Sequence, residues 1–294
     1  MSELKLPSIA FIGSGKMAQA MCKGFLASGI VQPSQVTMSD PHGNQYPVLE
    51  PLSVRLTRSN ITATQQSTIV FIAVKPHIVR PVLQEIYDYV TTEHIIVSIA
   101  GGITIETLEK DLPSGTRVIS AMPNTPCLVQ CGATVYTLGT CASKDDGQLL
   151  ATLLASLGLV EEIPERLMAA VVGVCGSGPA YMYMAAEALA DGGVKMGLPR
   201  DMSQRLAAQM MMGAAKMVLE AGEHPGKLKD NVCSPGGTTI CAVAALERLG
   251  FRSALIHAVE ASANRSLEIG EREKRRTEEE RSADVQKKRK IVDN

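Results

Sequence analysis

The chain has 294 residues, 45% hydrophobic composition and a formal net charge of −1, which is typical of a folded protein long enough for two domains. This charge argues against nucleic acid as a partner, because no basic excess is present to release counterions. No apolar run approaches the roughly 20 residues of a membrane span, so we expect no membrane partner either.

The N-terminus and the cysteines indicate a cytoplasmic protein. Residues 1–7 contain neither the apolar core of a signal peptide nor an Arg-rich amphipathic transit helix. The seven cysteines lack paired spacing, which fits reduced thiols. Cys127 and Cys131 are the closest pair, but no second pair and no nearby histidine completes a metal site, so we expect no metal.

A glycine-rich turn follows the first predicted strand. The strand at 8–12 stops at Gly13-Ser14-Gly15-Lys16-Met17-Ala18, and a helix with apolar spacing runs to residue 27. Strand, G-x-G-x-x-A and helix, in this order, predict a dinucleotide-binding turn. Gly13 permits the tight turn, Gly15 lets the pyrophosphate approach, and Ala18 keeps helix and strand close. A glycine-rich turn without a ligand is the alternative.

The second predicted strand, 36–40, ends in an acid. An acid at this place usually bonds the ribose 2′-hydroxyl of NAD and repels the 2′-phosphate of NADP. Asp40 can instead form an Asx turn before Pro41, so it is only a weak indication that the cofactor is NAD.

Further apolar runs predict strands at 69–74, 95–99, 118–122, 133–137 and 159–163. Strands without alternation, separated by helices, indicate a parallel sheet covered on both faces. Ligands of such a sheet lie beyond the carboxyl ends of its strands. We therefore expect three loops around the cofactor, with ordinary turn chemistry as the alternative for any single residue: Lys75-Pro76, Ala100-Gly101-Gly102 and Met122-Pro123-Asn124-Thr125-Pro126.

After Pro164 the sequence changes to helical runs rich in Ala, Met, Leu and Gly. Small residues let helices approach closely and Met fills gaps, so we expect tight helix packing, including packing across subunits. Pro81 predicts a kink or split in one helix, and Gly176-Ser177-Gly178-Pro179 predicts a bend or restart in another. We predict a dinucleotide-binding domain over 1–164, an all-helical domain over 165–270, and a charged tail over 271–294 that is disordered or a solvated helix.

A second candidate site precedes the apolar run 240–246. Gly236-Gly237-Thr238-Thr239 is typical of a helix N-terminus, whose free N–H groups and positive dipole end suit a small anion. An ordinary capped loop between two helices explains these residues equally well.

A dinucleotide-binding domain joined to a helical domain suggests hydride transfer. None of the five histidines lies in a glycine-flanked turn with an acidic partner. Lys195 and Lys216 could serve as general bases but carry no local signature. A substrate that needs little proton chemistry, such as an imine, fits better.

The chain resembles pyrroline-5-carboxylate reductase over about residues 9–268. The resemblance rests on residues 11–18, 73–76, 122–126, 176–180, 190–199 and 230–239. It implies a Rossmann-type α/β domain followed by an all-α domain that interlocks with a second subunit. It also implies dimers that family members assemble into larger rings, often decamers. The implied reaction, the last step of proline biosynthesis, is the reduction of the imine 1-pyrroline-5-carboxylate to L-proline with NAD(P)H.

Site residues follow from the same resemblance. Backbone groups of Gly236, Gly237 and Thr238, together with Ser234, would hold the substrate carboxylate, and the Thr239 hydroxyl would meet the ring nitrogen. Asn231 would reach the cofactor of a partner subunit. NADP, with NAD as the alternative, would lie against Gly13, Ser14, Gly15, Lys16, Met17, Asp40, Asn60, Ala73, Val74, Lys75, Pro76, Ala100 and Gly101.

Two positions depart from the family pattern. Some members have Ser where this chain has Asp40, and some have Glu where it has Gly222, which leaves a contribution of the adjacent Glu223 open. Two alternatives remain: a β-hydroxyacid dehydrogenase-like oxidoreductase with a catalytic Lys195 or Lys216, and a dinucleotide sensor without turnover.

Overall fold

The computed structural model describes residues 7–43 and 46–292, without the side chains of Tyr46 and of residues 283–292. The expectation for the first residues and the basic side chains at 287–290 lie outside this description. Contacts divide the chain into two units, one of Met1–Gly176 with Ser262–Asn294 and one of Ser177–Ala261. This division differs from the predicted boundary after residue 164, and it returns the last part of the chain to the first unit.

The first unit is built on a single sheet. Within the described residues this sheet has eight strands in the order β3-β2-β1-β4-β5-β6-β7-β8. Neighbouring strands run parallel except β6 and β7, which pair antiparallel, so the sheet is mixed at this end. Its strands are β1 (Ile9–Ile12), β2 (Val36–Ser39), β3 (Arg55–Thr57), β4 (Ile69–Ile72), β5 (Ile95–Ser98), β6 (Arg117–Met122), β7 (Gly132–Leu138) and β8 (Gly158–Glu162).

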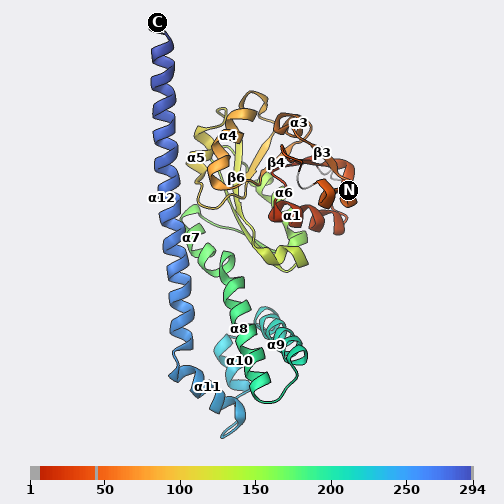
Figure 1. The fold of residues 1–294 in the computed structure, drawn as a ribbon, viewed down its shortest axis with the longest axis vertical. Coiled ribbons are helices and arrows are strands. Elements are labelled where there is room, and N and C mark those ends of the chain that lie inside the picture. The colour runs from red at the N-terminus through yellow and green to blue at the C-terminus, as the bar shows by residue number, and fades with distance from the viewer. Residues whose placement is uncertain (1–6, 44–45, 293–294) are drawn as a thin grey trace. The chain divides into compact units, whose positions relative to one another are not determined.

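Helices cover both faces of this sheet, as predicted (Figure 1). Because successive side chains of a strand point to opposite faces, Phe11 of β1 packs against α1 and α6, whereas Ile12 packs with residues of α3, α4 and α5. Phe11 also stacks on Phe71 of β4, with ring centroids 4.9 Å apart. The helices of this unit are α1 (Lys16–Ala27), α2 (Tyr46–Leu49), α3 (Asn60–Gln65), α4 (Pro76–Ile86), α5 (Ile105–Lys110), α6 (Lys144–Leu154) and α7 (Met168–Val171).

The structure tests the two helix breaks predicted at Pro81 and at residues 176–179. Pro81 lies inside α4, which continues past it to Ile86, so the predicted split does not occur. The restart near Gly176 is confirmed, because a π-helical turn, Val172–Gly176, ends there and α8 begins at Gly178 with Pro179 in its first turn.

The second unit is entirely helical, which confirms the predicted α/β domain followed by an all-α domain. It contains α8 (Gly178–Lys195), α9 (Arg200–Glu220), α10 (Pro225–Asn231), α11 (Thr238–Arg248) and the start of α12 (Phe251–Val292). Its described residues bury little apolar surface in the single chain: Ala190 and Ala207 are buried, whereas Met184 is 71% exposed and Met196 is 83% exposed. Such a unit needs a covering surface, because helices gain most of their stability by packing an apolar face.

Among the residues that the structure describes, one helical segment is long and apolar enough to span a membrane. Glu165–Lys195 has 31 residues and a mean hydropathy of 1.3 over its most apolar stretch, of which 6% is buried. The expectation that no apolar run of the chain approaches the length of a membrane span is therefore wrong for this segment. Length and composition alone do not distinguish a lipid-facing helix from one that packs against protein.

The charged tail is helical as far as the structure describes it, to residue 292. Helix α12 continues through residues 271–292. Ion pairs between neighbouring turns support it, with Arg276 Nη2 lying 2.7 Å from Glu273 Oε2 and Arg276 Nε lying 3.9 Å from Glu280 Oε1. The sequence left a disordered tail and a solvated helix open for this segment, and the helical alternative is the one found over 271–292.

Candidate active site

The glycine-rich turn is held between two strands. Gly13 has φ +95, a left-handed backbone conformation that favours glycine. Its N–H donates to Ser39 O at 3.1 Å, and a Cβ at this position would lie 2.6 Å from Ala73 O. The neighbouring Ala73 N–H donates to Ile12 O at 2.8 Å. The turn therefore has room for glycine alone at residue 13.

The N-terminus of α1 is open toward solvent. Gly15 is its N-cap residue, with extended backbone and no capping side chain, and a Cβ there would meet nothing within 4 Å. The first helical hydrogen bond runs from Gln19 N to Gly15 O at 3.0 Å. The N–H groups before it and the positive dipole end are available to an anion, so this turn fits the pyrophosphate of a dinucleotide. Lys16 is exposed beside it and Ser14 is buried below it.

The tip of β2 carries a buried acid. Asp40 is 8% exposed, its N–H donates to Thr57 O at 3.0 Å, and its Oδ1 accepts the N–H of His42 at 3.2 Å. The last contact is the predicted Asx turn. The strand tip therefore places a carboxylate at the position where dinucleotide-binding folds usually bind the ribose.

Asn60 is fixed beside this tip by two side-chain hydrogen bonds. The Ser39 hydroxyl donates to Asn60 Oδ1 at 2.6 Å, and Asn60 Nδ2 donates to Glu85 Oε2 at 2.7 Å. Ser39 and Glu85 were not predicted. The signal that could have found Ser39 is its place at the end of a buried strand, whereas nothing local marks Glu85 of α4.

The loops after β4 and β5 complete this edge of the sheet. Lys75 is the exposed N-cap residue of α4, followed by Pro76 in the first turn. Ala100 is buried, with its N–H donating to the Ser98 hydroxyl at 3.3 Å, and a Cβ on Gly101 would meet nothing within 4 Å. The structure thus brings the predicted cofactor residues of the first unit, including Met17 and Val74, to the carboxyl ends of β1, β2, β4 and β5. Their contacts with a cofactor remain a prediction.

Residues 122–126 form the third predicted loop, and its buried Asn124 has a structural role. Asn124 Nδ2 donates to Cys175 O at 3.1 Å, and Asn124 Oδ1 accepts the N–H of Ala133 at 2.9 Å. The amide therefore ties the end of β6 to β7 and to the π-helical turn.

A cavity of about 240 Å³ adjoins Ala100 and Gly101. Its wall was not predicted, because it combines four separate segments of the first unit. Glu165 contributes to this wall and also accepts the N–H of Ile105 through Oε1 at 2.7 Å, which caps the start of α5. The segments are the loop 100–104, the end of β6 at 120–122, residues 165–172 and residues 266–274 of α12.

The predicted second site lies in the second unit and forms a helix N-terminus, as predicted. Gly237 is the N-cap residue of α11, its N–H donates to Ser234 O at 3.1 Å, and a Cβ there would collide with the Ser234 hydroxyl. Gly236 before it has φ +66. The first helical bond, Cys241 N to Gly237 O, follows at 3.4 Å, so the N–H groups of residues 238–240 precede it. Thr238 is exposed and Thr239 half-buried.

Charged and amide side chains precede this loop on α10. Asn231, its last residue, donates from Nδ2 to Glu223 Oε2 at 3.3 Å. Lys229 Nζ lies 2.6 Å from Asp230 Oδ1, and this hydrogen bond lowers the pKa of Asp230 and raises the pKa of Lys229. Glu223 is thus a hydrogen-bond partner of Asn231.

The two alternative lysines are both exposed in the single chain. Lys195 is the exposed last residue of α8, and Lys216 forms an exposed pair with Glu220 at 3.7 Å. Among the described residues, no group of three or more His, Cys, Asp or Glu side chains is placed to hold a metal.

Comparison with known proteins gives the family. Residues 165–269 match the profile of the pyrroline-5-carboxylate reductase dimerisation family, and residues 8–102 match that of the coenzyme F420-dependent NADP oxidoreductase family. The chain is 51% identical over 267 residues to "Pyrroline-5-carboxylate reductase 2" of Bos taurus, covering 89% of this chain and 83% of the bovine one. It is 49% identical to "Pyrroline-5-carboxylate reductase 3" of Danio rerio, covering 91% and 93% of the two chains.

Solved structures agree with this result. The Plasmodium falciparum pyrroline carboxylate reductase with NADP bound is 32% identical, with a TM-score of 0.82, covering 90% of this chain and 98% of that one. A Coxiella burnetii pyrroline-5-carboxylate reductase superposes with a TM-score of 0.84 at 32% identity, over 90% and 99% of the two chains. This chain therefore belongs to the pyrroline-5-carboxylate reductases, a family of NAD(P)H-dependent oxidoreductases.

Proposed function

We propose that this enzyme reduces 1-pyrroline-5-carboxylate to L-proline with the substrate held at the N-terminus of α11. The observation that carries this assignment is the run of N–H groups at Thr238, Thr239 and Ile240, which precede the first helical bond of α11. These donors and the helix dipole favour a carboxylate. Gly236, Gly237 and Ser234 shape the loop before them, and Asn231 reaches toward the cofactor of a partner subunit.

The protein contributes mainly by orientation. The bound nicotinamide supplies the hydride that the imine carbon accepts. Fixing the carboxylate at the helix end restricts the orientation of the substrate ring. A restricted orientation removes much of the entropic part of the barrier to hydride transfer. The Thr239 hydroxyl, half-buried in the first turn, then donates to the ring nitrogen and stabilises the form of the imine that accepts hydride.

Replacing Thr239 by Val tests this role. We expect turnover to fall about 100-fold, as is typical when a proton or hydrogen-bond donor is lost from the reacting group. Thr238→Val is the matched control, because Thr238 acts through its backbone and should keep near-parental activity. The assay is oxidation of NADPH with racemic pyrroline-5-carboxylate. Parental turnover in Thr239→Val would show that the hydroxyl has no such role.

For the cofactor we propose NADP, with NAD as the alternative. The open N-terminus of α1 accommodates the pyrophosphate that both share. The second phosphate of NADP must lie near the β2 tip, where Asn60 and the nearby backbone offer polar groups and Asp40 opposes it. Steady-state rates with NADH and NADPH distinguish the two.

We further propose a cytoplasmic homo-oligomer built from dimers, with a decamer as the full assembly and without membrane or nucleic-acid partners. Support comes from the exposed apolar side chains of the second unit, which a second copy would cover, including those of the apolar helix α8. Free cysteines, among them the exposed Cys131 and Cys141, fit a reducing compartment. Sedimentation without detergent and localisation of the tagged protein test these points.

A further inference from the structure

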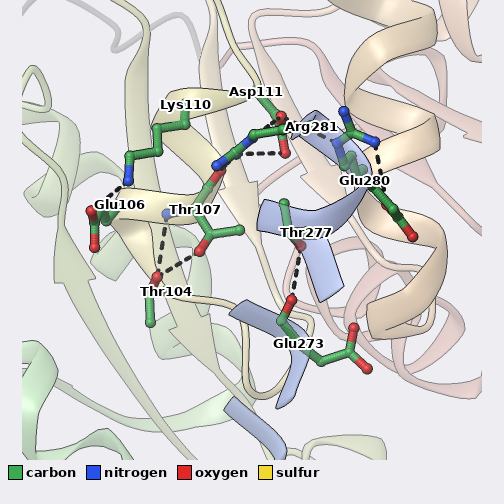
Figure 2. Close-up of polar contacts among 10 residues, drawn as sticks. Thr104, Glu106, Thr107, Lys110, Asp111, Glu273, Thr277, Glu280 and Arg281 are labelled. Carbon is green, nitrogen blue, oxygen red and sulfur yellow. Dashed lines mark hydrogen bonds and ion pairs between the residues drawn. The ribbon is translucent and has the colours of Figure 1, made fainter. Parts of the chain in front are cut away.

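The last part of α12 packs against α4 and α5 of the dinucleotide-binding unit, beyond the family match that ends at residue 269 (Figure 2). Gly270, Lys274, Thr277 and Arg281 share one face of the helix, because residues three or four apart lie above one another. Thr277 is 3% exposed, although the segment around it is strongly charged. This face is therefore a packed surface, not a solvated one.

Arg281 makes the densest contact of this face. Its Nε donates to Asp111 Oδ1 at 3.1 Å, its Nη2 lies 3.0 Å from Asp111 Oδ2, and the same Nη2 donates to Thr107 O at 3.1 Å. Two parallel contacts between a guanidinium and a carboxylate are both directional and strong. The Asp111 side chain is 7% exposed, so water competes poorly for it.

Three further ion pairs surround this contact. Arg80 of α4 has Nη1 3.2 Å from Glu280 Oε2 and Nε 3.6 Å from Asp111 Oδ1. On the other side, Lys274 Nζ lies 3.2 Å from Glu106 Oε2. Hydrogen bonds from Lys110 and Lys274 lower the pKa of Glu106, so this carboxylate stays ionised at neutral pH.

The same helix face forms part of the cavity beside the predicted cofactor residues Ala100 and Gly101. A Cβ on Gly102 would lie 3.2 Å from Ile269 Cγ2, and Gly270 and Lys274 line the cavity together with the loop 100–104. That loop leads directly into α5, which contains Thr107 and is followed by its C-cap residue Asp111. A displacement of α12 would therefore change the cavity wall and the loop that follows β5.

We propose that Arg281 and Asp111 are positioning residues, which clamp the C-terminal part of α12 as a wall of the cofactor cavity. The proposal rests on the proposed function in one respect, namely that Ala100 and Gly101 contact the cofactor. With the clamp closed, the loop 100–104 is held in its binding conformation. With the clamp open, a fraction of the molecules is not competent to bind, and the apparent dissociation constant rises in inverse proportion to the competent fraction.

The experiment compares three arginine variants of the full-length protein. Arg281→Met removes the guanidinium group, and Arg281→Lys retains a positive charge without the bidentate contact. Arg275→Met is the matched control, because it removes an exposed arginine of the same helix. We expect Arg281→Met to raise the Kd of NADPH about 5- to 10-fold with kcat within about twofold of the parent, because the competent fraction falls while the bound state is unchanged. Arg281→Lys should be intermediate and Arg275→Met unchanged.

A second readout follows the helix itself. Limited trypsin digestion should cleave within 272–276 faster in Arg281→Met than in the parent, which has the same Lys and Arg residues in this stretch, because local opening exposes the backbone. Asp111→Asn should behave like Arg281→Met. The double variant should be little worse than either single one, since both remove the same contact.

The results separate two failures. An unchanged NADPH Kd and unchanged digestion in Arg281→Met and Asp111→Asn overturn the clamp, as does an equal rise of the NADPH Kd in Arg275→Met. If Arg281→Met does not fold, Arg281→Lys and Asp111→Asn decide by the same readouts. NADPH binding is measured by fluorescence without turnover, so an enzyme that fails to reduce the imine would refute the proposed function while leaving the clamp testable.

Discussion

The Ser39 hydroxyl donates to Asn60 Oδ1 over 2.6 Å, and this contact joins the tip of β2 to the start of α3. Because Asn60 Nδ2 in turn donates to Glu85 Oε2 at 2.7 Å, both ends of the amide have a partner and its orientation is determined. Asn60 and Ser39 are both buried. The amide therefore fixes the carboxyl end of β2, which Asp40 directly follows.

Two substitutions at Asn60 should differ in a defined order. Asn60→Ala leaves the Ser39 hydroxyl and Glu85 without this partner, which should cost about 1–3 kcal/mol of unfolding free energy and weaken cofactor binding. Asn60→Asp should be worse at neutral pH, because a second carboxylate would face Glu85 at hydrogen-bond distance. Denaturant unfolding and NADPH titration measure both. Equal stability of the two variants would contradict the role of the amide nitrogen.

Asp40→Ser should shift the cofactor preference toward NADPH. The carboxylate at the β2 tip can bond a ribose hydroxyl, but it repels a 2′-phosphate. We expect the ratio of kcat/KM for NADPH to that for NADH to rise about tenfold or more, equivalent to at least about 1.4 kcal/mol. Because Asp40 Oδ1 also accepts the N–H of His42, Asp40→Asn is the control that keeps this acceptor and removes the charge. An unchanged ratio in both variants would exclude a dominant effect of the charge.

Gly13 and Gly15 offer a matched pair of alanine substitutions. Gly13→Ala forces a Cβ to 2.6 Å from Ala73 O at φ +95, so we expect a loss of roughly 1–3 kcal/mol of stability together with cofactor binding. Gly15→Ala meets nothing within 4 Å and should fold normally, but its methyl group would occupy the space that the pyrophosphate needs. Thermal unfolding and NADPH titration separate the two. Normal NADPH binding by Gly15→Ala would place the phosphates elsewhere.

Much of the dinucleotide-binding fold was predictable because its determinants are local. Central strands such as Ile69–Ile72 are continuous apolar runs, and the turn that starts α1 is marked by glycines at fixed offsets. The start of α11 in the helical unit is marked by glycines in the same way. The edge strand β3 was missed, since Arg55-Leu56-Thr57 has neither the length nor the apolar run of a central strand. Its partner Val36–Ser39 defines it, and pairing is not a local property.

The remaining parts depend on contacts between distant residues. Glu85 orients Asn60 across 25 positions, and Arg281 contacts Asp111 across 170. Local periodicity contains no term for such pairs, so the charged segment beyond residue 270 resembled a solvated tail. The roles of Thr239 and Asn231 came from the family resemblance, since the local pattern indicated only a helix N-terminus.

Leu206→Asp should weaken the oligomer. Leu206 of α9 is 55% exposed in the single chain, and we expect a second copy to cover this surface. A charge buried at such an interface without a partner is strongly unfavourable. Gln204→Asp is the control, because residue 204 lies about 200° around the helix from residue 206. Sedimentation velocity should show a smaller species for Leu206→Asp, and an unchanged assembly would mean that this face of α9 is free.

The thiol of Cys22 should resist alkylation in the folded enzyme. Burial raises its pKa from 9.0 to about 12, slightly offset by the nearby Lys23. In the unfolded chain the thiol ionises near its ordinary pKa, whereas the folded protein keeps it protonated. The free energy of unfolding is therefore unaffected by this thiol below about pH 9. It falls as pH rises from 9 to 12, by at most about 1.4 kcal/mol per pH unit.

Iodoacetamide at pH 8.5 should modify the exposed Cys131 and Cys141 and spare Cys22 until denaturant is added. In Cys22→Ala the decline in stability across this window should be shallower than in the parent. Modification of Cys22 at the rate of Cys141 would show that the α1 core opens readily.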